Sequence, residues 1–189
     1  QAFVFPDRSG ELIALRPELT PTLARMVAAR QNALTFPLRW WSFGPFWRYE
    51  RPQKGRSREF FQWNIDLIGV KGVAADAELI AVAASFFRNV GLRPEQVQIL
   101  VNNRKLMEAE LNRIGISDEL RPAILRLIDR IDKQPAEVWD ENVLRLGLTS
   151  MQLDQLKTLL LNQGLWQQSE ELQALFKQLE ALGAAEFVS

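Results

Sequence analysis

The stretch that decides the fold is residues 46–69, FWRYERPQKGRSREFFQWNIDLIG. Its second half alternates with a period of two, as a half-buried strand does. One side carries the apolar residues Phe61, Trp63, Ile65 and Leu67, and the other carries Phe60, Gln62, Asn64 and Asp66. Pro52 and Gly55 supply turn chemistry before this run. We therefore predict two antiparallel strands joined by a basic loop of about eight residues, with one face in the core and the other bearing the chemistry.

The loop concentrates positive charge in a chain whose formal net charge is zero. Between residues 48 and 59, two acidic residues stand against five basic ones, namely Arg48, Arg51, Lys54, Arg56 and Arg58. This excess predicts an anion site, such as one for a nucleotide phosphate, where cations neutralise charge that builds up in the transition state. Two alternatives stay open, a loop that grips an RNA backbone and one that is merely solvated.

Four residues are candidates for binding or catalysis. Arg48 is placed to bind a phosphate; the alternative interpretation is a surface cation that forms an ion pair with Glu50. Phe60 lies on the polar face, where a purine can stack on it, unless it packs beneath the loop. Gln62 and Asp66 share that face roughly 13 Å apart, at the two ends of a small pocket. Asp66 suits a cationic or proton-donating ligand, or it is paired with an arginine.

Composition excludes several kinds of chemistry. The 189 residues are 47% hydrophobic and 24% charged, as is usual for a globular protein, and they include neither cysteine nor histidine. Disulfides, zinc sites and Ser-His or Cys-His catalysis are therefore excluded, and catalysis must rest on Arg, Lys, carboxylates or a metal that the ligand carries. Because no apolar run approaches the length of a membrane span and no signal segment opens the chain, we expect a cytoplasmic protein.

Charge also divides the chain into two expected domains, an α+β region over 1–103 and a helical region over 104–189. The first has 13 Lys/Arg against 9 Asp/Glu, and the second has 10 against 14. The first region is predicted to open with a hairpin-like turn at residues 7–10 and a strand at 12–16. A helix is expected from about Pro21, with Thr20 as its N-cap and an apolar stripe of Leu23, Met26 and Val27.

Further elements follow the strand pair. Residues 74–90 have helical spacing and stop at Gly91, and this helix is predicted to pack on the apolar face of the sheet. Residues 97–101 are predicted to form a buried strand of the same sheet. Beyond Asn103 only short helices are expected, with stops at Gly115, Gly147 and Gly164. Two apolar stripes there indicate a plain helical core: Leu120, Ile124, Leu127 and Ile131, and Leu153, Leu156, Leu159 and Leu160.

Two motifs resemble histidyl-tRNA synthetase, a class II aminoacyl-tRNA synthetase. RYERPQKGRSREF at residues 48–60 is similar to the family's form of motif 2, and LRPELTPTLAR at 15–25 is similar to its histidine-specific motif. VNNRKL at 101–106 resembles the family's VNHRKLL segment more weakly. The resemblance implies that residues 1–103 form part of a class II catalytic core, an antiparallel sheet flanked by helices.

The resemblance also assigns roles. Arg48 would contact the α-phosphate and the histidine carboxylate, Glu50 the adenine side of ATP and Arg56 the distal phosphates. Phe60 would stack on adenine. Glu18 and Thr20 would bind the histidine α-amino group, and Gln62 and Asp66 would complete the amino-acid pocket. Asp66 matches the aspartate version of the pocket, whereas some bacterial members have glutamate, and it would accept a hydrogen bond from the imidazole.

The implied reaction joins histidine and ATP, with Mg²⁺ on the phosphates, and then transfers histidine to tRNA(His). The motif 1 helix, an RGLDYYTG-like segment and motif 3 are not found in these residues. The sequence begins at Gln1 without a methionine. We therefore expect an incomplete piece of a homodimeric parent, inactive by itself. Residues 104–189 would be the helical insertion that follows motif 2 and is thought to reach toward the tRNA acceptor stem, although its net negative charge gives that role no support.

Two rival functions stay open. The nearest is the synthetase-like regulatory subunit of ATP phosphoribosyltransferase, a relative that does not aminoacylate; the intact ERPQKGR loop argues against it. The other is a pure interaction module, in which the helical half docks a partner. Absence of ATP affinity, together with an Arg48→Ala variant that is indistinguishable from wild type, would favour the interaction module.

Overall fold

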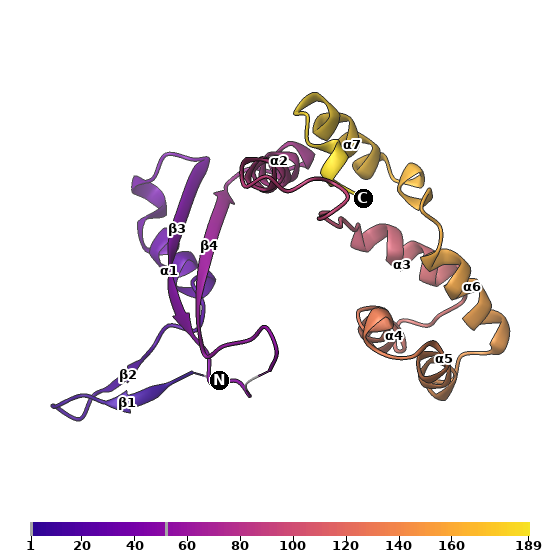
Figure 1. The fold of residues 1–189 in the computed structure, drawn as a ribbon, viewed down its shortest axis with the longest axis horizontal. Helices are drawn as coiled ribbons and strands as arrows, with labels where there is room; N and C mark the ends of the chain where they lie inside the picture. The colour runs from indigo at the N-terminus through magenta and orange to yellow at the C-terminus, as the bar shows by residue number, and fades with distance from the viewer. Residues whose placement is uncertain (1, 52) are drawn as a thin grey trace. The chain divides into compact units, whose positions relative to one another are not determined.

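An antiparallel strand pair dominates the first part of the computed structural model, which describes residues 2–51 and 53–189 (Figure 1). Strands β3 (Leu38–Trp47) and β4 (Glu59–Ile68) pair along their whole length, from Leu38 opposite Ile68 to Trp47 opposite Glu59. The predicted hairpin is confirmed. Its loop, residues 48–58, is longer than expected, and Gly55 adopts a left-handed φ of 76° within it. The turn role predicted for Pro52 lies outside the described residues.

The two faces of the hairpin differ from the prediction. On the face expected to be core, Trp41, Phe43 and Phe61 are 72%, 64% and 61% exposed, and Phe43 and Phe61 stack at 5.4 Å. Burial on this face rises only toward Ile65 and Leu67, which are half-buried. The prediction of a core face is therefore wrong for the half of the face nearest the loop. On the opposite face, Phe46 is almost fully buried.

A smaller hairpin precedes these strands. β1 (Val4–Pro6) pairs with β2 (Leu12–Ala14), and the Asp7 carboxylate accepts hydrogen bonds from the Ser9 hydroxyl and from the backbone N–H groups of Ser9 and Glu11. These bonds lower the pKa of Asp7. Gly10 supplies a left-handed φ of 86°. The predicted turn is confirmed, while the second strand ends before the expected Arg16.

Helix α1 (Thr20–Arg30) follows, with Pro21 in its first turn as predicted. The predicted N-cap is wrong: Leu19 occupies the cap position without a side-chain hydrogen bond, and Thr20 is already helical. A short 3-10 turn, η1 (Gln31–Ala33), continues the helix. Of the predicted apolar stripe, Leu23 and Val27 are half-buried and Met26 is 58% exposed.

Beyond β4 the regular elements are helices, as predicted for residues 74–90 and for the region after Asn103. The α-helices are α2 (Val73–Asn89), α3 (Arg104–Arg113), α4 (Arg121–Ile128), α5 (Ala136–Arg145), α6 (Ser150–Leu160) and α7 (Glu170–Ala181). Single 3-10 turns lie between or after them, at η2 (Ile131–Lys133), η3 (Leu165–Gln168) and η4 (Ala185–Phe187). Among the described residues, no helix has the length and apolarity needed to cross a membrane.

The helical part has a contiguous core. Trp139 and Val143 of α5 are buried with Leu111 of α3, Ile124 of α4 and Leu156 of α6. The Trp139 indole N–H donates to the Leu127 carbonyl at 2.9 Å, so the ring is buried without an unsatisfied donor. The two predicted stripes are confirmed as core or as residues packed against it.

Residues 97–101 do not form the predicted strand. Ile99 makes only an isolated parallel bridge with Val188, and Leu100 is 80% exposed. Near that bridge, Arg88 of α2 donates to the Gly183 carbonyl and pairs with Glu186 at 2.9 Å. The apolar run therefore anchors the C-terminal segment and joins neither hairpin within the described residues.

The chain divides into two compact units, residues 1–75 and 76–189. The boundary falls inside α2, shortly after the strand pair. The predicted division after residue 103 concerns where the family's catalytic core ends, and it stays a prediction.

Candidate functional site

The LRPE segment, residues 15–18, is joined to the end of β3 and to Arg48 by three hydrogen bonds. The Trp47 amide donates to the Arg16 carbonyl at 3.0 Å, and Arg16 Nε donates to the Pro45 carbonyl at 2.9 Å. Arg48, which follows β3, donates through Nε to the Pro17 carbonyl of the LRPE segment at 3.0 Å. The structure thus joins the two motifs that sequence comparison singled out, at Arg48.

Arg48 is half-buried and held on two sides. Besides its bond to Pro17, its guanidinium lies over the Phe60 ring, 4.9 Å from the ring centre. Glu50, the partner considered from sequence, instead pairs with Arg56 at 3.6 Å. Because Nε is already committed to a carbonyl, Arg48 is a fixed cation with its remaining N–H groups able to meet a ligand.

Phe60 is half-buried and stacks on Phe46, with the ring centres 6.3 Å apart and the planes inclined by 25°. Gln62, Asn64 and Asp66 follow it on the same face of β4 and are also half-buried. Asp66 forms no ion pair with an arginine or lysine within residues 2–51 and 53–189, so its carboxylate can accept a ligand donor. The side-chain amide nitrogen of Asn64 is buried without a hydrogen-bond partner there. This face therefore combines an aromatic ring, amides and a carboxylate.

The loop carries exposed, loosely paired charges. The Arg56 and Glu50 side chains are 67% and 39% exposed, so their ion pair contributes little stability and a ligand can displace it. Arg58 lies over the Tyr49 ring at 4.8 Å. Arg51 and Lys54 are exposed.

Glu18 follows Pro17 directly, Thr20 comes two residues later, and both are exposed. In the part of the chain that the structure describes, their side chains form no hydrogen bond or ion pair with the other predicted site residues. The structure therefore brings Arg48 and Phe60 into contact, and Glu50 and Arg56 into contact. It places Gln62 and Asp66 on the face of Phe60, and it brings Glu18 and Thr20 near Arg48 only through the backbone of Pro17.

Sequence reasoning missed Arg16, whose guanidinium lies over the Phe46 ring at 4.5 Å. Its position inside LRPE was the available signal. No group of three or more His, Cys, Asp or Glu side chains able to hold a metal ion occurs among residues 2–51 and 53–189.

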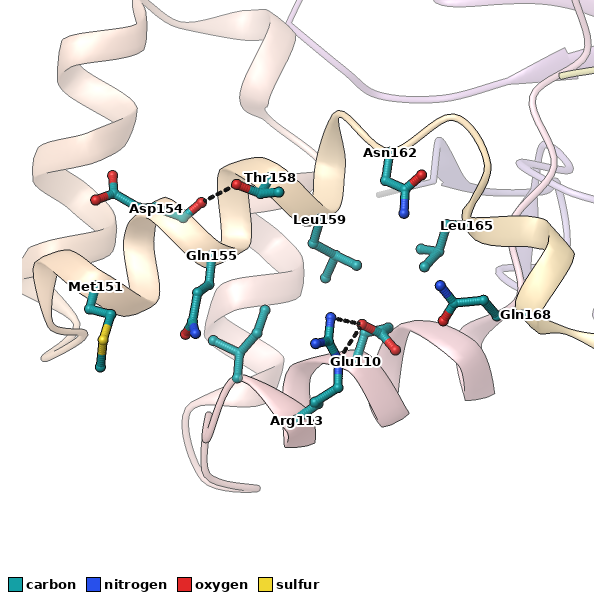
Figure 2. A pocket seen from close by; sticks show the side chains of 11 residues that line it. Glu110, Arg113, Met151, Asp154, Gln155, Thr158, Leu159, Asn162, Leu165 and Gln168 are labelled. Carbon is teal, nitrogen blue, oxygen red and sulfur yellow. Dashed lines mark hydrogen bonds and ion pairs between the residues drawn. The ribbon is translucent and has the colours of Figure 1, made fainter.

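A concavity of about 540 Å³ lies between α3 and α6 in the helical unit (Figure 2). Glu110 is buried there, and one of its oxygens accepts from Arg113 Nε and Nη2 at 2.9 and 2.7 Å. Asn162 and Gln168 point toward the space in Figure 2. Because Arg113 neutralises Glu110, the cavity presents no uncompensated charge from this pair, and sequence reasoning had assigned the region to a core alone.

The fold and the joined motifs define an aminoacyl-tRNA synthetase type of architecture, in which antiparallel strands precede a helical region. A family model described as histidyl-tRNA synthetase matches residues 1–187, and the chain belongs to that family. It is 41% identical over 160 residues to the chloroplastic/mitochondrial histidine–tRNA ligase of Arabidopsis thaliana, covering 85% of this chain and 32% of that protein. It is 39% identical to the enzyme of Halobacterium salinarum, with coverage of 85% and 37%. The chain thus spans about a third of these relatives.

Solved structures agree on the fold. Histidyl-tRNA synthetase from Nostoc sp. matches with a TM-score of 0.78 at 22% identity, covering all of this chain and 47% of that one. A Bacillus halodurans structure described as an ATP phosphoribosyltransferase regulatory subunit/histidyl-tRNA synthetase matches with a TM-score of 0.76 at 24% identity, covering 100% and 52%. At these identities the likeness concerns the fold alone.

Proposed function

We propose that the full-length protein is a class II histidine–tRNA ligase. It would condense histidine with ATP to histidyl-adenylate, releasing pyrophosphate, and then transfer histidine to tRNA(His), releasing AMP. The observation that carries the proposal is the hydrogen-bonded junction of LRPE with the end of β3, where Arg48 lies between the Pro17 carbonyl and the Phe60 ring. Family membership supports the same reaction.

Arg48 is the proposed catalytic residue. Attack of the histidine carboxylate on the α-phosphate places additional negative charge on the phosphoryl oxygens. A guanidinium whose Nε is anchored can offer its remaining donors to both reacting groups without first being reorganised. The role assigned to Arg48 therefore fits its half-buried, doubly held position.

Glu50, Arg56 and Phe60 are the proposed ATP contacts. The distal phosphates would displace the Glu50 carboxylate from Arg56, because the pair is exposed and long at 3.6 Å. Glu50 would then be able to accept from the adenine amino group. Phe60 would supply an apolar ring for the base.

Gln62, Asp66, Glu18 and Thr20 are the proposed histidine contacts. Asp66, which has no cationic partner among the described residues, would accept from the imidazole N–H. Glu18 and Thr20 would bind the α-ammonium group. A half-buried acceptor of this kind discriminates against side chains that cannot donate a hydrogen bond.

Several properties of the full-length protein belong to the same proposal. Mg²⁺ would enter on the ATP phosphates, since oxygen ligands suit it and it is commonly held by substrate phosphates. Residues 1–103 would belong to the catalytic core and 104–189 to an insertion near the tRNA. The protein would be a cytoplasmic homodimer, and the 189 residues alone would be inactive.

Histidine-dependent ATP–pyrophosphate exchange in the full-length protein tests the proposal. We expect exchange with histidine alone among the amino acids, and Arg48→Ala to reduce it by roughly 100- to 1,000-fold. Arg51→Ala removes an exposed cation from the same loop and should leave exchange within about twofold. No exchange with any amino acid, from a folded protein, would instead favour the regulatory-subunit reading.

A further inference from the structure

Two arginines hold the motif junction in a reciprocal way. Arg16 reaches from the LRPE segment to the Pro45 carbonyl of β3, while Arg48 reaches from the end of β3 to the Pro17 carbonyl of the LRPE segment. Each guanidinium also covers a ring, Arg16 over Phe46 at 4.5 Å and Arg48 over Phe60 at 4.9 Å. The two rings stack on each other. Arg16, Phe46, Phe60 and Arg48 therefore form one continuous set of contacts, which we call the arginine clasp.

Gly44 makes room for the clasp. A Cβ placed on Gly44 would lie 2.5 Å from Arg16 Nη2, closer than side chains approach. Gly44 is opposite Gln62 in the strand register, on the face that carries Phe60 and Asp66. Its φ does not lie in the left-handed region, so the backbone itself does not require glycine. What the position requires is space for the guanidinium.

No carboxylate pairs with Arg16 within residues 2–51 and 53–189. A hydrogen bond to a carbonyl and a ring contact therefore orient its guanidinium. The planar guanidinium can lie over a ring while its edge donates to a carbonyl, whereas the compact ammonium of lysine has no such plane. The ring beneath it, Phe46, is 1% exposed and cannot easily change its orientation.

We propose that Arg16 is a positioning residue for adenylate formation, acting through Phe46 and Phe60 on the orientation of Arg48. The proposal rests on the proposed function. Arg16 keeps the Pro17 carbonyl and the Phe60 ring in place, and these are the two groups that hold Arg48. A misplacement of about 1 Å can cost roughly 100-fold in rate, so the loss of Arg16 is felt at Arg48.

The test is histidine-dependent exchange in the full-length protein, measured as kcat and KM for Arg16→Ala, Arg16→Lys and Gly44→Ala. We expect each to lower kcat by roughly 10- to 100-fold, with KM for histidine changed by less than about threefold. Gly44→Ala keeps the charge of Arg16 and only displaces its guanidinium. Ser42→Ala, on the same face of the same strand, adds no atom beside Arg16 and should retain wild-type exchange.

Double variants separate positioning from other roles. Gly44→Ala combined with Arg16→Ala should be no slower than the slower single variant, and Arg16→Ala should cost less in a Phe60→Ala background than in wild type. Near-ultraviolet circular dichroism and thermal unfolding should match wild type for Arg16→Lys, which keeps the fold even where Gly44→Ala does not.

Three outcomes would overturn the inference while the wild-type protein exchanges normally with histidine. The first is full kcat in Arg16→Lys, which would assign the effect to charge alone. The second is that the losses of kcat in Arg16→Ala and Phe60→Ala multiply in the double variant. The third is wild-type kcat in Gly44→Ala. Absence of exchange from wild type itself would instead defeat the proposed function.

Discussion

The unit of residues 1–75 and the unit of residues 76–189 are stabilised by different means. In the helical unit, large side chains from several helices share one buried core around Trp139. In the first unit, Leu38 and Phe46 are the only large apolar side chains that are fully buried among the described residues. Its motif junction depends on a few carbonyl bonds and cation–ring contacts.

This difference teaches where each kind of substitution will act. Removing a core side chain costs transfer free energy and leaves a cavity, so its effect is on stability. Removing Arg16 or Arg48 from the arginine clasp leaves no large cavity, so the effect is on geometry and hence on rate. Four further predictions break or sharpen this contrast.

The largest effect is expected from Trp139→Ala. Trp139 is 2% exposed and its indole N–H is hydrogen-bonded to Leu127, so its removal should destabilise the helical unit by about 3–5 kcal/mol. Urea unfolding followed by far-ultraviolet circular dichroism measures this. Trp41→Ala, at a position 72% exposed in the first unit, is the matched control and should change stability by no more than about 0.5 kcal/mol. Equal losses for the two tryptophans would contradict the contrast.

Phe60→Ala should weaken ATP binding by roughly tenfold, because an aromatic face contributes on the order of 1–3 kcal/mol to stacking with a base. The measurement is KM for ATP in the exchange reaction. Phe61→Ala removes the neighbouring ring, which points to the opposite face and is 61% exposed. It should leave KM for ATP unchanged, and a similar rise for both variants would show that the faces are not distinguished.

Thr149→Ala should destabilise the helical unit by about 1 kcal/mol. Thr149 is the N-cap of α6, and its hydroxyl accepts from the Gln152 amide while the Gln152 side chain accepts from the Thr149 amide. Thr158→Ala, in the same helix but within its last turns, removes only a bond to the Asp154 carbonyl and should be nearly neutral. Thermal unfolding ranks the two, and an inert Thr149→Ala would exclude a stabilising capping box.

The smallest effect concerns pH. The hydrogen bond from Lys105, together with that from Asn103, lowers the pKa of Glu171, and the same pairing raises the pKa of Lys105. A lowered carboxyl pKa contributes stability above the ordinary pKa of Glu171, and this is lost as the pH falls through the lowered value. Glu171→Gln should therefore lower Tm slightly at neutral pH and converge with wild type in acid. A difference that grows toward acid would have the wrong sign.

Much of the fold could be predicted from local pattern. The two-residue period predicted the β3–β4 hairpin, the Asp7–Gly10 turn and the stops at Gly91, Gly115 and Gly147 carry their own signals, and the helical stripes indicated the core. Apolarity alone misled at residues 97–101, where the run bridges the C-terminal segment at Val188. It also misled at Phe61, because a periodic pattern identifies a face without showing how fully that face is buried.

The candidate site divides in the same way. Arg48 and Phe60 could be selected from charge and strand periodicity, whereas Glu50 and Arg56 were assigned roles only by the resemblance of RYERPQKGRSREF to motif 2. Their partners could not be selected. Glu50 was weighed as the partner of Arg48 and instead pairs with Arg56, because the loop turns back at Gly55.

The sequence by itself determined that a basic hairpin precedes a helical region, that these 189 residues supply no cysteine or histidine side chain, and which family the chain resembles. These properties depend on residue identity and short-range periodicity. Only the tertiary structure decided that Arg16 donates to the Pro45 carbonyl while Arg48 donates to the Pro17 carbonyl. It also decided that Gly44 leaves space for the Arg16 guanidinium. Such contacts join residues about thirty positions apart, and a pairing at that separation is fixed by the packing of strand against segment, which no local pattern encodes.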